Sequence, residues 1–550
     1  MTGKKASPDS VHPTKTDRRS FNTWETFTSM ARVGISLPLL FTPQLVSLGT
    51  ELTRIISGKS TLQPGLNDYR FKDPAWETNP IYKASMQTYL AWCGYLQGLI
   101  DETPLSEDEK LQAKTAIERL THSLSPSHPG ASLDAVQHTI KARGASLVHG
   151  LNRMTSDVLG LEEPVISSVS SKLTIGKDIA ITAGSVVFRN ELLELIQYKT
   201  VSAKVYREPI LLISSPINKF YIYDLYPHNS LTHYLVEAGF QVFTLSWRNP
   251  SQKHKHWNLE SYIESLLDAT ETVHAISGNT KLHLFGYSAG GIFAALLSSI
   301  LAQRDGIEAT TASFVVTNFY TQTRAQVGIA ISQQMLLAAK TLLKLRGILE
   351  GKELARMFAW LRPNCLLWNA WTCNYFAGED QPTADVRYWN TDIPRIPNSL
   401  FCDFLDLYSD DYLLQPGHLT LCGYPVDLSL ITGDKYFVAG SSDHITPWEY
   451  CYQSSLKLSG QREFVLVNRG HMRSLICPEG SKAARFYTNT RADENYSDWL
   501  SEATQHQGSW WSHWIDWLQQ RSTNTKNNLH KLGNTEFPPL APAPGKYVIE

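Results

Sequence analysis

Short apolar runs separated by longer mixed segments dominate the chain from about residue 184 onward. Four of these runs come before residue 320, at Pro209–Ser214, Gln241–Trp247, Lys281–Gly286 and Ala312–Asn318. The segments between the middle runs are long enough to contain helices. Short apolar strands that alternate with helices predict a parallel sheet covered on both faces. Ahead of these runs, residues 185–198 have the pattern of a β-hairpin.

The strand pattern stops near residue 318 and resumes only at Lys435–Gly440 and Glu463–Asn468. The intervening residues 319–430 contain helical segments and aromatic loops. Open α/β sheets place their sites at the carboxyl ends of their strands. We therefore expect a cap insertion at about 319–430 over that edge of the sheet, within an α/β catalytic domain spanning residues 184–550.

The region before the sheet is helical in pattern. We expect a helical N-terminal domain over residues 21–183, with an amphipathic helix at Pro80–Ile100. Residues 1–20 are polar and mixed in charge, and they are predicted to be disordered. The most apolar early run, Val33–Gly49, has 17 residues and two prolines. A spanning helix needs about 20 residues, so we expect no transmembrane span and favour a packed helix over a weak surface anchor.

Composition narrows the classes of function. The 550 residues carry a formal net charge of −2, which gives a nucleic-acid partner no electrostatic support. The seven cysteines are scattered without a C-x-x-C pair, which fits reduced thiols in a cytoplasmic protein better than a disulfide framework or a zinc site. The histidines of the stretch His254–His256 lack a third ligand nearby. We expect neither a metal nor a cofactor.

One apolar run leads directly into a catalytic motif. The run Lys281–Gly286 ends in the first glycine of Gly-Tyr-Ser-Ala-Gly, which has Ser288 at its centre. An apolar helix is predicted to follow at Gly291–Gln303. A strand, a Gly-x-Ser-x-Gly turn and a helix form a nucleophile elbow. The motif alone is expected by chance about 0.2 times in a chain of this length. The strand before it and the helix after it are therefore the stronger evidence for an elbow.

Two later loops hold candidate partners for this serine. A serine hydroxyl needs a base, and in this arrangement an acid and then a histidine follow the later strands. Asp443 lies three residues after Lys435–Gly440, and His471 follows Glu463–Asn468 closely. Each residue alone fits an ordinary loop, but their order and placement together predict a triad in which His471 takes the proton and Asp443 orients the imidazole. His444 is a second candidate for the base.

An oxyanion hole needs two backbone donors. The amide of Ala289, directly after the serine, is the first candidate. The second is expected from the loop after Pro209–Ser214, in which Pro216 has no N–H. Ile217 and Asn218 are the candidates there.

Several longer stretches resemble the poly(3-hydroxyalkanoate) synthases. The resemblance runs from about residue 20 to the end of the chain and is strongest to the class II branch. It rests mainly on these stretches: Asp73–Tyr82, Gly184–Tyr198, Ser215–Pro250, Leu361–Pro382, Tyr388–Asp392, Asp443–Trp448 and Ser509–Ser522. The resemblance implies an α/β-hydrolase core with a helical N-terminal domain and a cap. It also implies an acyltransferase that joins (R)-3-hydroxyacyl groups from coenzyme A thioesters into a storage polyester, acting as a homodimer on cytoplasmic granules.

The sequence departs from this family at two positions. The family places a cysteine in the elbow where this chain has Ser288, and it leads us to expect a longer side chain where this chain has Pro216. An acyl-serine ester lies lower in energy than an acyl-cysteine thioester and is attacked more slowly. Serine also depends more on its base than cysteine does. Transfer to a growing chain should be slower, and water should compete better.

Three functions follow from these observations. The first is a serine-using polyhydroxyalkanoate synthase, favoured by the resemblance along the chain. The second is a serine hydrolase on the same scaffold, a polyester depolymerase, esterase or thioesterase, favoured by Ser288 itself. The third is a non-catalytic granule protein that pairs with a cysteine synthase; the presence of both Asp443 and His471 argues against it.

Overall fold

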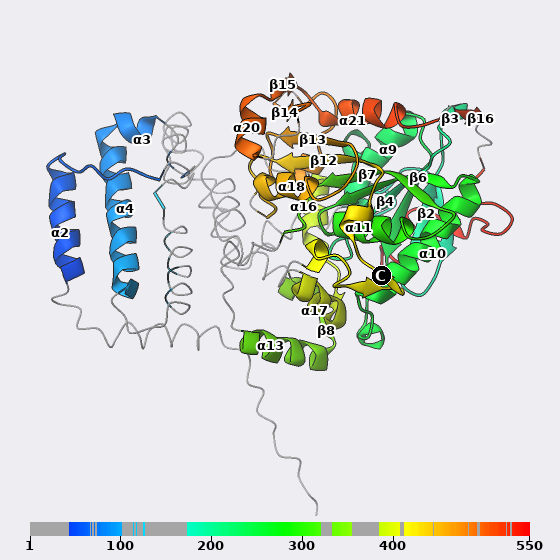
Figure 1. Cartoon of the computed structure of the whole chain (residues 1–550), viewed down its shortest axis with the longest axis horizontal. Coiled ribbons are helices and arrows are strands. Elements are labelled where there is room, and N and C mark those ends of the chain that lie inside the picture. The colour runs from blue at the N-terminus through cyan, green and yellow to red at the C-terminus, as the bar shows by residue number, and fades with distance from the viewer. Residues whose placement is uncertain are drawn as a thin grey trace, which may run out of the picture. The chain divides into compact units, whose positions relative to one another are not determined.

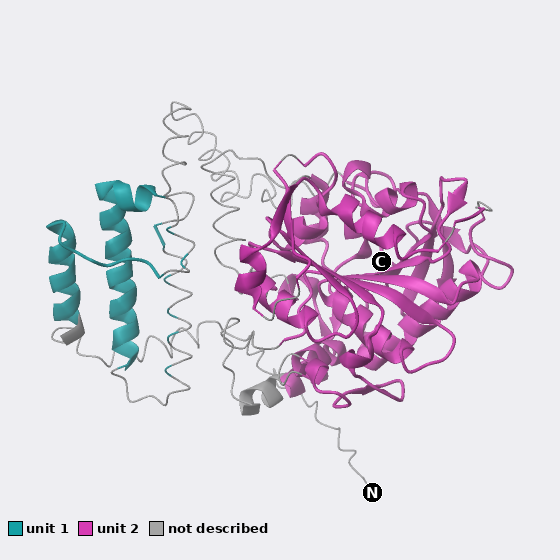
Figure 2. Ribbon diagram, turned by 45° about the horizontal axis from the view of Figure 1, so that its top comes forward, with its two compact units in different colours: residues 1–127 teal, residues 128–550 magenta. Residues whose placement is uncertain are grey.

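The chain forms two compact units, residues 1–127 and 128–550, shown in Figure 2. The computed structural model describes eight isolated residues between 68 and 126 and these ranges: 43–65, 74–101, 173–320, 333–354, 384–407, 412–443, 445–481, 483–491, 495–523, 525–527 and 531–550. The predicted disorder of residues 1–20 lies outside the described residues, as does the first part of the run Val33–Gly49.

The first unit is helical where it is described. It contains α2 (Pro43–Ile56), α3 (Ala75–Thr78) and α4 (Pro80–Asp101), and α4 confirms the helix predicted at Pro80–Ile100. A small aromatic cluster that includes Trp76 and Tyr89 packs α3 against α4. Within the described ranges, no helix has both the length and the apolar character needed to cross a bilayer.

The second unit is built on an 11-stranded sheet, which runs through the middle of that unit in Figure 1. Six neighbouring strands at its centre are parallel, and they include every apolar run that the sequence assigns to the sheet. In spatial order these strands are β5 (Val242–Trp247), β4 (Ile210–Ile213), β6 (Lys281–Tyr287), β7 (Glu308–Val315), β12 (Asp434–Gly440) and β13 (Arg462–Val467).

Antiparallel strands extend the sheet on both sides. One edge has the predicted hairpin, β1 (Gly184–Arg189) with β2 (Leu193–Tyr198), and then β17 (Ala541–Pro542). The other edge has β14 (Arg485–Thr488) and β15 (Thr504–Gln507), which the apolar pattern did not predict.

Alternate side chains of the central strands enter two separate cores. Leu211 of β4 points to the face covered by α10 (Leu259–Ser277) and α11 (Ala289–Leu301), whereas Leu212 points to the other face. This is why these strands read as continuous apolar runs rather than alternating ones.

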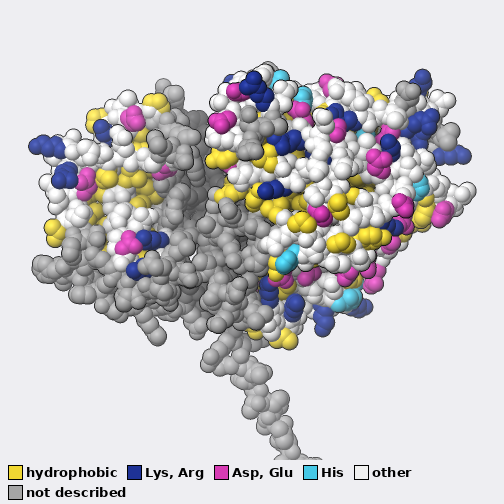
Figure 3. Space-filling view, in the orientation of Figure 1, with side chains coloured by type: hydrophobic (Ala, Val, Ile, Leu, Met, Phe, Trp, Pro, Cys, Tyr) yellow, Lys and Arg dark blue, Asp and Glu magenta, His cyan; other side chains and the backbone are white. Residues whose placement is uncertain are grey.

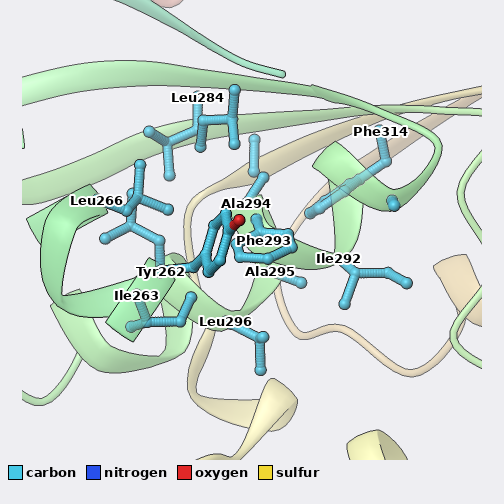
Figure 4. Packing of buried hydrophobic residues seen from close by; sticks show 14 of the residues in the cluster. Tyr262, Ile263, Leu266, Leu284, Ile292, Phe293, Ala294, Ala295, Leu296 and Phe314 are labelled. Atoms are coloured by element: carbon cyan, nitrogen blue, oxygen red, sulfur yellow. The ribbon is translucent and has the colours of Figure 1, made fainter. Parts of the chain in front are cut away.

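Helix α11 lies at the centre of the first of these cores. Figure 4 shows Phe293 of α11 packed with Tyr262 and Leu266 of α10 and with Leu284 of β6. All thirteen residues of α11 are buried. The helix that follows the predicted elbow is therefore fixed by packing on every side.

The opposite face is covered by α9 (Leu231–Glu237) and α21 (Trp510–Gln519). The four tryptophans of α21 are all buried, and Trp514 donates a hydrogen bond from Nε1 to the Ser313 hydroxyl of β7 at 2.9 Å. These aromatic residues pack the core of the sheet.

Along the chain, helical segments separate β7 from β12, although the two strands are neighbours in the sheet. The described part of this insertion contains α13 (Gln333–Arg346), α16 (Ala384–Thr391) and α17 (Asn398–Leu407). The residues 321–332, 355–383 and 408–411 of the expected cap lie outside the described residues.

Candidate active site

Ser288 lies on a strained turn between β6 and α11. Its backbone φ is 53° and its ψ is −122°, a conformation that costs free energy for a residue with a side chain. The amide of Ser288 donates to the carbonyl oxygen of Val315 on β7 at 2.9 Å, and the Ser288 carbonyl oxygen accepts from the Gly291 amide at 2.9 Å. The turn is thus held by the neighbouring strand and by its own helix.

The glycines around Ser288 permit close backbone contacts. A Cβ atom on Gly286 would collide with the backbone of Gly290 and Gly291, and one on Gly290 would collide with the carbonyl oxygen of Ile213 on β4. These contacts explain why small residues flank the serine. They confirm the strand, turn and helix of the predicted elbow.

The structure brings the three predicted triad residues together. His471, the first residue of α19 (His471–Leu475), has its Nε2 atom 3.1 Å from Ser288 Oγ. Its Nδ1 atom lies 2.7 Å from Asp443 Oδ2. Asp443 follows β12 and His471 follows β13, so two adjacent parallel strands deliver the acid and the base to the same edge as the serine. When His471 Nδ1 keeps its proton and donates it in a hydrogen bond to the Asp443 carboxylate, Nε2 is free to accept the Ser288 proton.

Asp443 is buried and accepts hydrogen bonds at both carboxylate oxygens. Oδ1 accepts from the amides of Ile445 at 2.8 Å and Thr446 at 3.2 Å, and Oδ2 accepts from the Thr446 hydroxyl at 2.8 Å as well as from His471. Burial would raise the pKa of Asp443, but the adjacent His471 ring and these hydrogen bonds hold that pKa below its ordinary value. The carboxylate is therefore charged when it orients the imidazole.

The predicted oxyanion residues lie at the start of α11 and in the loop that follows β4. Ala289 is the first residue of α11, so its amide has no partner within the helix. The amides of Ile217 and Asn218 belong to a turn at the end of β4 and donate to the hydroxyl and the carbonyl oxygen of Ser215, at 3.1 and 3.3 Å. Their use by an oxyanion stays a prediction. His444 lies outside the described residues.

The sequence reasoning missed Thr446, the hydroxyl that contacts both acid and base. Its Oγ1 atom lies 3.3 Å from His471 Nδ1, in addition to its bond to Asp443. A threonine three residues after a candidate acid is a recognisable turn signal, because such hydroxyls and amides often close a turn around an aspartate.

Two groups outside the triad contain histidine or cysteine side chains that could in principle bind a metal. The ring of His254 stacks on Trp257 at 4.1 Å, and its Nδ1 accepts from the Ser251 amide at 3.0 Å. Among the described residues, Glu260, Glu264 and Cys422 lie close enough together to share an ion, but both carboxylates are exposed. Nothing else in the structure marks that group as a metal site.

Charged side chains of both signs are interspersed over the face of the second unit seen in Figure 3. This agrees with the small net charge of the chain. The described side chains on this face form no single extended patch of basic groups.

Comparisons with known proteins assign the chain to a family. Residues 67–235 match the family described as "Poly-beta-hydroxybutyrate polymerase (PhaC) N-terminus", and residues 222–475 match the α/β-hydrolase fold. The chain is 40% identical to poly(3-hydroxyalkanoate) polymerase 2 of Ectopseudomonas oleovorans, over 95% of this chain and 94% of that protein. It is 36% identical to polymerase 1 of the same organism, over 95% and 93%. It is 32% identical to the polymerase subunit PhaC of Cupriavidus necator, over 89% and 84%. These similarities cover nearly the whole chain and confirm the resemblance found in the sequence: the chain has an α/β-hydrolase fold and belongs to the poly(3-hydroxyalkanoate) polymerase family.

Proposed function

We propose that this chain is an acyltransferase that polymerises (R)-3-hydroxyacyl groups from coenzyme A thioesters through a covalent acyl-enzyme on Ser288. Family membership supports the reaction class. The observation that carries the role of Ser288 is its hydroxyl, 3.1 Å from a histidine whose other nitrogen is bound by a buried carboxylate.

The geometry allows a balanced acyl transfer. Ser288 Oγ attacks the thioester carbonyl carbon while its proton passes to His471 Nε2. The carbon–sulfur bond then breaks, and the coenzyme A sulfur leaves with that proton as a thiol. In the second half, His471 takes the proton of an incoming hydroxyl group, whose oxygen attacks the acyl-serine ester. The bond to Ser288 Oγ then breaks, and Oγ receives that proton from His471. A hydroxyacyl chain end as the attacking group lengthens the polymer, whereas water hydrolyses the ester.

No described cysteine replaces the serine. Cys451 lies in α18 (Trp448–Ser455), directly after the loop that carries Asp443, and its Sγ is 3.6 Å from the Thr446 carbonyl oxygen. Burial and the charge of Asp443 raise the pKa of the Cys451 thiol, so it remains neutral and weakly nucleophilic.

The direct test is to supply purified protein with an (R)-3-hydroxyacyl-coenzyme A. We expect release of coenzyme A and formation of polymer, and Ser288→Ala should abolish both. Ser288→Cys should raise the polymer yield several-fold, because an acyl-cysteine thioester passes its acyl group on more readily than an acyl-serine ester. Release of free hydroxy acid without any polymer, by wild type and by Ser288→Cys alike, would overturn the proposal.

A serine hydrolase is the second candidate, because Ser288 itself is the residue that esterases and lipases carry in this turn. Covalent labelling by a fluorophosphonate should occur in wild type and be lost in Ser288→Ala for either enzyme. The products distinguish the two functions. When the wild-type enzyme, which the probe can label, is given substrate, a hydrolase yields free acid and a synthase yields polyester.

We also propose the domain organisation, partners and location that the sequence predicts. The sequence predicts a helical domain at residues 21–183 and a catalytic domain at 184–550, with a cap at about 319–430. Ile179 and Ala180 are buried in a core of the second unit, so we propose that the catalytic domain begins before residue 179. A homodimer at the surface of a cytoplasmic polyester granule fits the proposed activity; light scattering and fractionation of granules would test these two points.

A further inference from the structure

One hydroxyl beside the triad has no role in the acyl transfer described above. Thr446 lies on the loop between β12 and α18, and its Oγ1 atom is 2.8 Å from Asp443 Oδ2 and 3.3 Å from His471 Nδ1. The His471 nitrogen is 2.7 Å from the same carboxylate oxygen. A hydroxyl, an imidazole nitrogen and a carboxylate oxygen therefore meet at one point.

The directions of these hydrogen bonds follow from the groups themselves. An ionised carboxylate only accepts, so Thr446 and His471 both donate to Oδ2. The Thr446 oxygen is then left with lone pairs facing His471 Nδ1–H, at the longer distance of 3.3 Å. Thr446 thus favours the tautomer with its proton on Nδ1, which is the one that leaves Nε2 free to accept the Ser288 proton.

The carboxylate is held in a fixed plane by four donors, and Thr446 supplies two of them. Its amide donates to Oδ1 and its hydroxyl to Oδ2. The amide bond depends only on the backbone turn, whereas the hydroxyl bond depends on the side chain. Removing the hydroxyl alone therefore leaves the turn in place but frees Oδ2 to rotate away from His471.

We propose that Thr446 is a positioning residue, whose hydroxyl holds the Asp443 carboxylate in the orientation that presents His471 Nε2 to Ser288. This role rests on the proposed function of the triad. It is independent of whether the acyl group passes to a hydroxyacyl chain or to water.

The test compares Thr446→Val, which keeps the shape of the side chain, with Thr446→Ser, which keeps its hydroxyl. We expect Thr446→Val to lower both kcat for coenzyme A release and the rate of fluorophosphonate labelling about tenfold, because one charge-assisted hydrogen bond is lost. KM should stay nearly unchanged, because no substrate contact is removed. Thr446→Ser should restore most of both rates.

Thr488→Val is a matched control. Thr488 on β14 also has its hydroxyl bonded to a histidine, with Oγ1 2.8 Å from His506 Nε2, but that pair lies at the sheet edge away from the triad. This variant should keep wild-type kcat and labelling.

Three results would overturn the role of Thr446. The first is a wild-type labelling rate in Thr446→Val. The second is a loss of rate in Thr446→Val that Thr446→Ser fails to restore. The third is a loss of rate that is fully explained by a fall in the thermal stability of Thr446→Val, which indicates a structural role only.

Labelling also separates this proposal from the synthase reaction, since a wild type that labels at Ser288 but makes no polymer refutes only the synthase reaction. A wild type that never labels refutes both.

Discussion

At the scale of single residues, the unusual feature is a hydroxyl where the family resemblance leads one to expect a thiol. A thiol is partly ionised near neutral pH, whereas a serine hydroxyl is not, so Ser288 depends on its base throughout the reaction. The structure meets that requirement with a histidine 3.1 Å away and a buried aspartate behind it. The three residues could be proposed from the sequence because each follows a strand that the apolar pattern reveals, and their side chains meet in the structure.

Asp443→Asn tests how strongly the serine depends on this support. An amide nitrogen facing His471 Nδ1 donates rather than accepts, which moves the imidazole proton to Nε2 and prevents that atom from accepting the Ser288 proton. We expect kcat for coenzyme A release to fall about 10,000-fold, the size of this effect in serine triads, with KM little changed. Asp427→Asn, at a turn where the aspartate caps Ser429, is the matched control. An Asp443→Asn variant with more than a tenth of wild-type activity would contradict a triad mechanism.

At the scale of elements, the strand β6, the elbow and the helix α11 act as one unit. The sequence predicted the strand and helix to within a few residues, because apolar runs and small residues mark them clearly. It could not identify the second oxyanion donor or Thr446. Both depend on the direction of a single amide or hydroxyl in a loop, and that direction is set by contacts between segments far apart in the chain.

Gly290→Ala tests the close contact between α11 and β4. The added methyl group would collide with the Ile213 carbonyl oxygen, which belongs to the sheet backbone and cannot move easily. We expect a loss of about 1–3 kcal/mol in the free energy of unfolding. Labelling of Ser288 should also slow, because a movement of α11 away from β4 displaces the Ala289 amide.

Gly94→Ala is the control. It makes the same change in α4, where nothing lies within 4 Å of the new methyl group, and it should be neutral or slightly stabilising. Equal stability changes in the two variants would exclude the collision as the cause.

At the scale of the whole catalytic unit, segments distant in the sequence complete the fold. Edge strands such as β15, with the sequence Thr-Gln-His-Gln, lack an apolar pattern and were not predictable. The position of segment 541–550 was also not predictable from its own sequence, because the segment is anchored by a buried carboxylate on β2 more than 300 residues earlier. Glu194 Oε2 accepts from the amides of Lys546 and Tyr547, both at 2.9 Å, while Oε1 pairs with Arg189.

The same segment also contacts the loops that follow β4 and β5. Lys219, which follows the predicted oxyanion residues, donates to the Val548 carbonyl oxygen at 2.6 Å. Arg248, which follows β5, lies over the Tyr547 ring and pairs with Glu550 at 3.0 Å. Segment 541–550 therefore contributes to holding both loops, and its release should loosen them.

Glu194→Gln should release this segment. An amide cannot accept from two backbone donors and pair with Arg189 at once, so one side of the buried contact is lost, at a cost of about 2–4 kcal/mol. Trypsin cleaves after lysine, and the Lys546–Tyr547 bond in wild type is protected because both amides are bound to Glu194. We expect mass spectrometry after brief trypsin treatment to show early loss of residues 547–550 in Glu194→Gln only. Glu536→Gln, which alters an exposed carboxylate on the neighbouring loop, should cleave at the wild-type rate. If Glu194→Gln also cleaves at that rate, the carboxylate does not anchor the segment, and its other contacts hold it, among them the pairing of β17 with β1 and the bonds of Lys219 and Arg248.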